Sequence, residues 1–220
     1  MAHSAASTQT ISPRWVFPSA VGAEYLAREL RLPEPITQLL IRRGYADSAS
    51  AREFLNPRIE SLHDPFLLRD MDRAVARIEA AIAACQTIEI HGDYDVDGVT
   101  STVVLKKALE IAGATCHWHI PHRLRDGYGM QPEAVDGAAA RGVNLIISVD
   151  NGIRAAGAIA RARELGIDVI VTDHHLPETD LPPALAIINP SRADCSYPNP
   201  NLCGAGVALK LAHALLLGAG

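Results

Sequence analysis

The chain has 220 residues, of which 48% are hydrophobic, and this content is sufficient to bury the core of a globular protein. Its net charge of −5 excludes a protein that coats nucleic acid through bulk positive charge, although a local site for a polyanion is compatible with it. The sequence contains no run of about 18 apolar residues and no apolar signal-peptide segment, so we expect a cytoplasmic protein with no membrane contact.

The first part of the chain predicts helices. Residues 1–13 are small and polar, and we expect them to form a disordered leader. Residues 14–85 show helical periodicity in the stretches AVGAEYLAREL, EPITQLLIRRG, DSASAREFL and DMDRAVARIEAAIAAC, with Asp47 or Ser48 as a helix cap. The two prolines of NPRIESLHDPF predict an irregular connector before the last of these helices. The sequence therefore predicts a small helical N-terminal region over 14–85.

From residue 86 onward, short apolar or β-branched runs alternate with helical runs, which is typical of parallel βαβ units. The predicted strands lie at 87–92, 115–121, 143–150, 167–173 and 184–189. The predicted helices lie at 98–113, 132–141, 153–165 and 205–217. Right-handed crossovers between such strands form one parallel sheet with helices on both faces. The predicted fold class is therefore α/β, with this domain spanning residues 86–220.

Side chains that could bind a ligand follow four of the five predicted strands. In an open parallel sheet, the ligand crevice lies outside the carboxyl ends of the strands. The candidates there are His91, Asp93, Asp95 and Asp97, then His119, His122, Arg123 and Arg125, then Asp150, and finally Asp173, His174 and His175. Ionised carboxylates held close together and partly out of water cost several kcal/mol unless a counter-charge is bound. We therefore expect cations at this edge of the sheet.

Carboxylate and imidazole ligands without a thiolate favour Mn²⁺ or Mg²⁺, with Mn²⁺ the first choice, although hydrolytic zinc sites also use these ligands. More than four candidate ligands indicate two ions about 3.5–4 Å apart, and Asp150, alone at its strand end, is the natural bridge between them. Such a pair activates water and stabilises an in-line displacement at phosphorus. The set therefore predicts hydrolysis of a phosphoester or phosphoanhydride, with His175 placed to donate a proton or a hydrogen bond.

Simpler interpretations exist for several of these residues. Asp93 could be only a helix cap or turn residue, and His117 and His119 could form a half-buried strand face. Arg123 precedes the glycine-bracketed loop DGYGM, so it could contact a phosphate or lie solvated beside an ordinary tight turn. The convergence of the whole set on one edge favours the metal centre over a collection of unrelated caps.

The motifs HGDYDVDG, SVDNG, VTDHH and IINP, in this order, resemble the first motifs of the DHH phosphoesterase superfamily. Together with IPHRLRDGYGM, the segment after DHH and the preceding helical region, they resemble the RecJ exonucleases over nearly the whole chain. The resemblance implies a metal-dependent 5′→3′ exonuclease that acts on single-stranded DNA in recombination and repair. It also implies partners such as a single-strand-binding protein or a helicase.

The resemblance further implies how two divalent ions, Mn²⁺ or Mg²⁺, would be held. His91 and Asp95 would bind one ion, and Asp97 and His174 would bind the other. Asp150 would bridge the two ions.

The same resemblance implies roles for residues around the metal ions. His175 would face the scissile phosphate as an acid or hydrogen-bond donor, with Asp173 orienting its neighbours. Arg123 and the loop of Gly127, Tyr128 and Gly129 would lie along the DNA path. Asp93 would support the metal ligands without binding an ion itself.

The RecJ core continues beyond the GAGVALKLA helix to a further metal-binding aspartate, a DHHA1-type domain and an OB-fold, whereas this sequence ends at Gly220. The sequence therefore predicts an N-terminal fragment that lacks one ligand and one wall of the DNA channel. Two alternatives are a DHH-type hydrolase of short oligonucleotides, cyclic dinucleotides or pyrophosphate, and a non-catalytic nucleic-acid-binding or scaffold fragment. The helical region and the GYG loop favour the exonuclease, and the retained ligand positions disfavour the scaffold.

Overall fold

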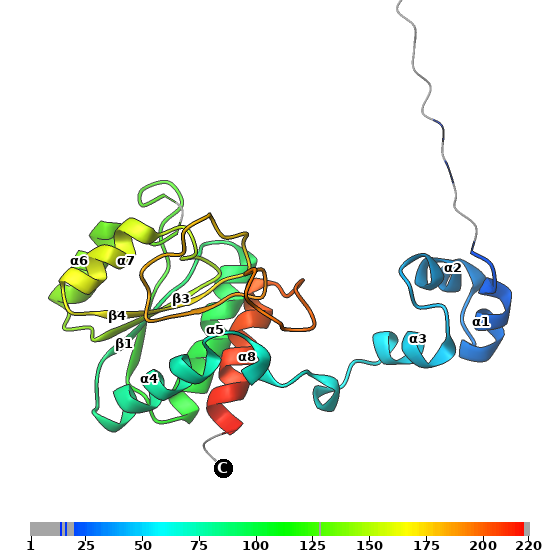
Figure 1. Cartoon of the computed structure of the whole chain (residues 1–220), viewed down its shortest axis with the longest axis horizontal. Coiled ribbons are helices and arrows are strands. Elements are labelled where there is room, and N and C mark those ends of the chain that lie inside the picture. The colour runs from blue at the N-terminus through cyan, green and yellow to red at the C-terminus, as the bar shows by residue number, and fades with distance from the viewer. Residues whose placement is uncertain (1–13, 15, 17–19, 128, 218–220) are drawn as a thin grey trace, which may run out of the picture. The chain divides into compact units, whose positions relative to one another are not determined.

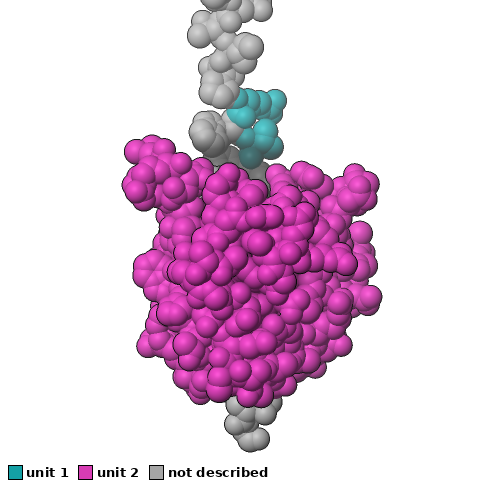
Figure 2. All heavy atoms as spheres, turned by 90° about the vertical axis from the view of Figure 1, so that its left-hand side faces the viewer, with its two compact units in different colours: residues 1–62 teal, residues 63–220 magenta. Residues whose placement is uncertain are grey.

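The computed structural model describes residues 14, 16, 20–127 and 129–217. The predicted leader, residues 1–13, lies outside the described residues. Internal contacts divide the chain into two compact units, 1–62 and 63–220, coloured teal and magenta in Figure 2. This division falls before helix α4 (Met71–Ala83), which the sequence had grouped with the helical region. The reason is packing: α4 buries Met71 and Ile78 in the same core as Ile88 of the sheet.

The first unit is a small group of helices. It contains α1 (Ala23–Leu30), α2 (Glu34–Arg42), α3 (Ser48–Leu55) and the short 3-10 helix η1 (Ile59–Ser61). The carboxylate of Asp47 accepts hydrogen bonds from the N–H groups of Ala49 and Ser50, at 3.0 and 2.9 Å, so the predicted cap is confirmed. Leu26, Leu40 and Ala51 form the core of this unit.

The second unit begins with the 3-10 helix η2 (Pro65–Leu67) and helix α4, and then alternates strands with helices. The strands are β1 (Ile88–His91), β2 (Cys116–His119), β3 (Leu145–Val149), β4 (Asp168–Thr172) and β5 (Ala186–Ile188). The further helices are α5 (Val96–Ile111), α6 (Pro132–Ala140), α7 (Ala156–Glu164) and α8 (Gly204–Leu217). Every strand lies inside its predicted range.

Among the described residues, the strands form one parallel sheet in the order β2-β1-β3-β4-β5. Helices α4, α5 and α8 cover one face, and α6 and α7 cover the other, as Figure 1 shows. Alternate residues of β3 enter the two cores: Leu145 and Ile147 face the first group of helices, and Ile146 faces the second. The predicted α/β architecture is confirmed. None of the described helices has the length and apolar character that a membrane span requires.

One close approach of backbone segments makes a glycine necessary near the end of β1. A Cβ atom on Gly98, in the first turn of α5, would lie 2.6 Å from the backbone nitrogen and oxygen of Asp93. We predict that Gly98→Ala lowers the free energy of unfolding by about 1–3 kcal/mol, the cost of forcing a methyl group into a packed site. Gly157→Ala, in the first turn of α7 with open space around its Cβ, is the matched control and is expected to be neutral or stabilising. Urea unfolding measures both, and equal effects would contradict the packing argument.

Candidate metal centre

The parallel register brings the carboxyl ends of β1, β3 and β4 together. His91 is paired with Ser148 of β3, and Val149 is paired with Thr172 of β4. Asp150 directly follows β3, and its N–H group donates to the carbonyl oxygen of Thr172 at 2.9 Å. The aspartates that end three neighbouring strands therefore converge on one edge of the sheet, although they lie up to 80 residues apart in sequence.

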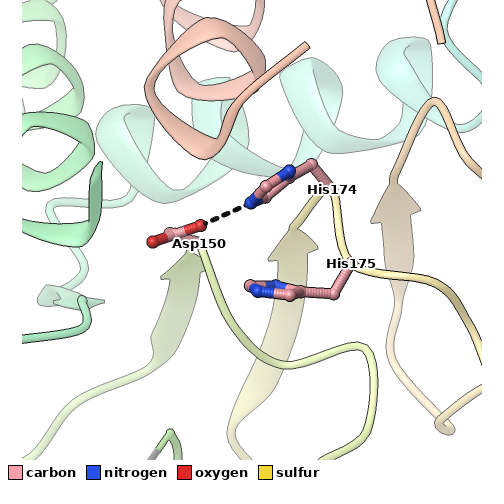
Figure 3. Close-up of side chains that lie close together, drawn as sticks. All are labelled: Asp150, His174 and His175. Atoms are coloured by element: carbon pink, nitrogen blue, oxygen red, sulfur yellow. Dashed lines mark ion pairs between the residues drawn. The ribbon is translucent and has the colours of Figure 1, made fainter. Parts of the chain in front are cut away.

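Two overlapping groups of candidate ligands lie at this edge. One contains Asp93, Asp95 and Asp150, and the other contains Asp150, His174 and His175. Within each group, one potential ligand atom per residue lies within 4.8 Å of the others. Figure 3 shows Asp150 at the end of its strand, with the rings of His174 and His175 turned toward it. Asp150 belongs to both groups, which is the position expected of a bridging carboxylate.

The carboxylate of Asp150 is buried without adequate compensation. Its side chain is 2% exposed, and burial, followed by the nearby charges of Asp97 and Asp95, raises its pKa to about 8. Nε2 of His174 lies 3.1 Å from Oδ1 of Asp150, but the geometry forms no hydrogen bond, so Oδ1 has no hydrogen-bond partner in the described part of the chain. An arriving divalent cation would remove this electrostatic penalty.

Asp95 and Asp97 are held at two helix N-termini. Oδ1 of Asp95 caps α5 by accepting the N–H groups of Asp97 and Gly98, each at 3.0 Å. The two oxygens of Asp97 accept the N–H groups of Gly204 and Ala205 at the start of α8, each at 2.7 Å. Asp97 thus ties α5 to α8 and lies 3.6 Å from Nε2 of His174.

Gly204 is a site residue whose role the sequence did not reveal. A Cβ atom there would lie 2.4 Å from Oδ1 of Asp150, so the start of α8 can approach the centre only with glycine at this position. The GAG motif was a weak sequence signal, because close packing of helices requires the same residues.

Asp173 fixes the orientation of the neighbouring histidines. Its Oδ1 accepts the backbone N–H groups of His174 and His175, at 2.7 and 3.1 Å, and lies 2.7 Å from Nδ1 of His175. Its Oδ2 accepts the N–H group of Ile153 at 3.0 Å. A carboxylate at Nδ1 places the ring proton on that nitrogen, so Nε2 is the atom of His175 that can act on a substrate.

His91 lies in neither ligand group. Its Nε2 is 2.7 Å from Oε1 of buried Glu89, and its ring lies 5.2 Å from that of His119. Arg141 holds Glu89 through Nε at 3.1 Å and Nη2 at 2.8 Å. Nδ1 of His91 is buried and has no partner among the described residues. Metal ligation by His91 stays a prediction, and Glu89 in the otherwise apolar TIEI run was the signal that a buried polar network exists here.

Asp93 lies closer to the centre than the sequence suggested. It is 1% exposed, it shares a ligand group with Asp95 and Asp150, and its Oδ1 lacks a hydrogen-bond partner in the described regions. Burial is the main cause that raises its pKa. These observations add Asp93 to the candidate ligands.

Among the predicted DNA-path residues, Arg123 and Gly127 are exposed and Gly129 is partly exposed, and Arg123 lies near this edge. The guanidinium carbon of Arg123 lies 4.8 Å from the centre of the Tyr94 ring. The positive charge of Arg123 is also close enough to Asp93 to oppose the rise in its pKa. Gly127 and Gly129 both adopt positive φ angles, of 80° and 71°. Tyr128 lies outside the described residues.

The residues present fit a pair of hard divalent cations. The candidate ligands are carboxylate oxygens and imidazole nitrogens, without a thiolate, which suits Mn²⁺ or Mg²⁺. Buried, unpartnered ligand atoms on Asp93 and Asp150 are a further sign, since such atoms are otherwise costly. The arrangement can therefore hold cations that would polarise a phosphate and a water molecule.

Comparisons with known proteins show what this chain is similar to. The sequence model of the DHH family, N-terminal domain, matches residues 87–219. The chain is 44% identical over 191 residues to the single-stranded-DNA-specific exonuclease RecJ of Bacillus subtilis, covering 87% of this chain and 24% of that protein. It is also 44% identical over 179 residues to RecJ of Escherichia coli, covering 80% of this chain and 31% of that protein.

Solved structures show the same likeness. A crystal structure of exonuclease RecJ bound to manganese matches with a TM-score of 0.62 and 38% identity, over 70% of this chain and 39% of that chain. RecJ from Thermus thermophilus in complex with Mn²⁺ matches with a TM-score of 0.70 and 30% identity, over 93% of this chain and 28% of that one.

The curated relatives are much longer than the matched region, and the chain spans only about a quarter to a third of their length. The family match, in contrast, covers well over half of the present chain and includes the strand ends described above. The sequence motifs, the parallel sheet and the family match lead to one conclusion: this chain belongs to the DHH family.

Proposed function

We propose that the chain is the phosphoesterase part of a single-stranded-DNA exonuclease that hydrolyses phosphodiester bonds in the 5′→3′ direction with two Mn²⁺ or Mg²⁺ ions. The observation that carries this proposal is the buried carboxylate of Asp150, which belongs to two ligand groups and whose Oδ1 has no hydrogen-bond partner among the described residues. The identity to RecJ enzymes supports the choice of substrate.

Each residue of the metal centre would have a distinct role. Asp95, Asp97, Asp150 and His174 would hold the ions, with Asp93 or His91 completing the first site. When bound, the ions would lower the pKa of a water molecule and neutralise charge on the phosphate. In its doubly protonated form, with Nδ1–H held by Asp173, His175 would direct Nε2–H at the scissile phosphate and donate a hydrogen bond or proton there.

Arg123 and the neighbouring glycine loop would guide the DNA strand to the metal centre. Arg123, placed on the Tyr94 ring, would contact a phosphate, and the loop from Gly127 through Tyr128 to Gly129 would bring backbone N–H groups close to the DNA. The setting would be the cytoplasm, where a single-strand-binding protein or helicase would supply the strand. The domain scheme would be a helical region over 14–85 followed by the DHH domain, with α4 packed onto the latter.

The test is the Mn²⁺-dependent release of mononucleotides from a long 5′-phosphorylated single strand, compared with hydrolysis of a dinucleotide. We predict that the long strand is preferred and that His175→Ala lowers the rate by about a hundredfold or more, the usual contribution of a positioned acid or base. Although His175 lies in the same group as Asp150 and His174, the proposal assigns it to the phosphate, so the variant should keep its Mn²⁺ binding through His174 and the carboxylates. His117→Ala, on an exposed part of edge strand β2, is the matched control.

Other results would favour the two alternatives. Preference for the dinucleotide would favour a hydrolase of small nucleotides. Uptake of two ions without any hydrolysis would favour a binding or scaffold module.

A further inference from the structure

A cavity of about 290 Å³ lies beside the candidate metal centre, and Arg154 forms part of its wall. Asp173 and His175 line the same cavity, so Arg154 and the group that would act on the scissile phosphate face one space. Arg154 is exposed, so a bound molecule can reach its guanidinium. The mechanism proposed above assigns no role to Arg154.

Two hydrogen bonds hold the guanidinium of Arg154 against the segment that carries His175. Its Nε and Nη2 atoms donate to the carbonyl oxygen of Leu176, at 3.2 and 3.0 Å. The same segment is also fixed by Asn189, whose Nδ2 donates to the carbonyl oxygen of His175 at 2.9 Å. The guanidinium is therefore held beside the backbone of His175 and Leu176, on a segment that is itself restrained.

These bonds leave part of the guanidinium available to a ligand. A guanidinium carries five N–H donors, and the two bonds to Leu176 use only those of Nε and one of Nη2. Within the described part of the chain, Arg154 has no carboxylate partner. This differs from Arg161, farther along α7, which pairs with Asp136 at 2.8 Å. The free end of the Arg154 fork presents N–H groups of Nη1 and Nη2, a geometry that suits two oxygens of a phosphate.

The position of Arg154 in the chain also favours a bound anion. It directly precedes Ala155, the N-cap residue of α7. The N-terminal end of a helix carries partial positive charge, so a cation there lowers the stability of the helix unless an anion lies nearby. The first turn of α7, which the structure describes completely, contains no acidic residue. An anion bound by Arg154 would remove this unfavourable interaction.

We propose that Arg154 binds a phosphate of the single strand that neighbours the phosphate facing His175, through the N–H groups of Nη1 and Nη2. The inference rests on the proposed function, because it places a second phosphate relative to the scissile one. A strand carries a phosphate at every nucleotide, so a cation held beside His175 is placed to meet the next one. The contact is independent of base sequence, since phosphate oxygens are the same at each nucleotide.

The first experiment measures the binding of a fluorescent oligothymidine by anisotropy, with the 220-residue chain saturated with Mn²⁺ and carrying His175→Ala to suppress hydrolysis. Arg154→Gln should weaken binding at least about tenfold, the lower end for a hydrogen bond to a charged group. The slope of log K against log salt should become shallower by about 0.7, the value for one phosphate contact on a single strand.

The matched control is Arg163→Gln, an exposed arginine in the last turn of α7. It removes the same charge from the chain, at the end of the helix away from the metal centre, and should alter neither the affinity nor the salt dependence. Equal effects of the two glutamine substitutions would overturn the proposal.

A second experiment separates a phosphate contact from a loosened loop around Leu176. A series of strands carries one uncharged methylphosphonate linkage each, moved stepwise from the 5′ end. One member of the series should bind about tenfold more weakly to the chain with Arg154 but should cause no further loss in Arg154→Gln, because the two changes remove the same contact. Equal losses in both chains at every position would overturn the proposal, since Arg154 would then act only on its own loop.

The proposed function fails by a different measurement. A chain with Arg154 and His175 intact that releases no mononucleotide in the presence of Mn²⁺ contradicts the proposed function. A shallower salt dependence in Arg154→Gln, with the control unaltered, supports the phosphate contact even then. A chain that binds no single strand contradicts both.

Discussion

Asp150→Asn is expected to weaken the binding of Mn²⁺ by at least about a hundredfold, with both ions affected. Asp150 belongs to both ligand groups, and asparagine keeps its shape while removing the charge that a cation would neutralise. Loss of a residue that only supports a ligand already costs about 10–100-fold in affinity, so loss of a shared ligand should exceed this range. Isothermal titration calorimetry measures the effect directly.

The control for this substitution is Asp180→Asn, an exposed aspartate outside both ligand groups. It removes the same charge from the chain, so any change in Mn²⁺ binding through net charge alone would appear in both variants. We expect the control to bind Mn²⁺ as the unaltered chain does. Loss of only one of the two ions in Asp150→Asn would show that Asp150 is not the bridge.

The metal-free chain is expected to lose stability as the pH rises from about 6.5 to 8. In the folded state the pKa of Asp150 is raised to about 8, chiefly by burial and then by neighbouring carboxylates, whereas its ordinary value is 3.8. Between these values the folded state holds a proton that the unfolded state has released. The stabilising contribution is therefore complete below the ordinary pKa and is lost as the pH rises through the raised one, at no more than about 1.4 kcal/mol per pH unit for the one proton.

The choice of pH range separates Asp150 from a nearby histidine. Burial lowers the pKa of His119 from its ordinary value of 6.5, so near that pH its unfolded form holds the extra proton and its effect on stability has the opposite sign, which fades as the pH rises further. The pKa of Asp93 is also raised, so ionisation of Asp93, like that of Asp150, lowers the stability of the folded state as the pH rises. Urea unfolding in the presence of a chelator measures the effect.

The decrease in the free energy of unfolding per pH unit should be smaller in Asp150→Asn, because asparagine cannot ionise. It should also be smaller at saturating Mn²⁺, because the cation takes the place of the proton. A chain whose metal-free stability rises between pH 6.5 and 8 would contradict the electrostatic description of the centre.

The sequence by itself determined the order of the elements and the chemical type of the site. Short apolar or β-branched runs predicted the strands, because a parallel strand buried on both faces, such as β3, must be apolar along its length. The runs HGDYDVDG, SVDNG and VTDHH stand at strand ends, where the topology of a parallel sheet brings ligands together. Local pattern and topology were therefore sufficient to predict a centre of carboxylates and histidines.

The tertiary structure alone decided which atoms meet. It grouped Asp93 with Asp150, turned His91 toward Glu89, and placed Gly204 against Asp150. It also joined α4 to the sheet rather than to the preceding helices. These outcomes depend on side-chain direction and on contacts between segments far apart in the chain, neither of which periodicity or spacing along a sequence can specify.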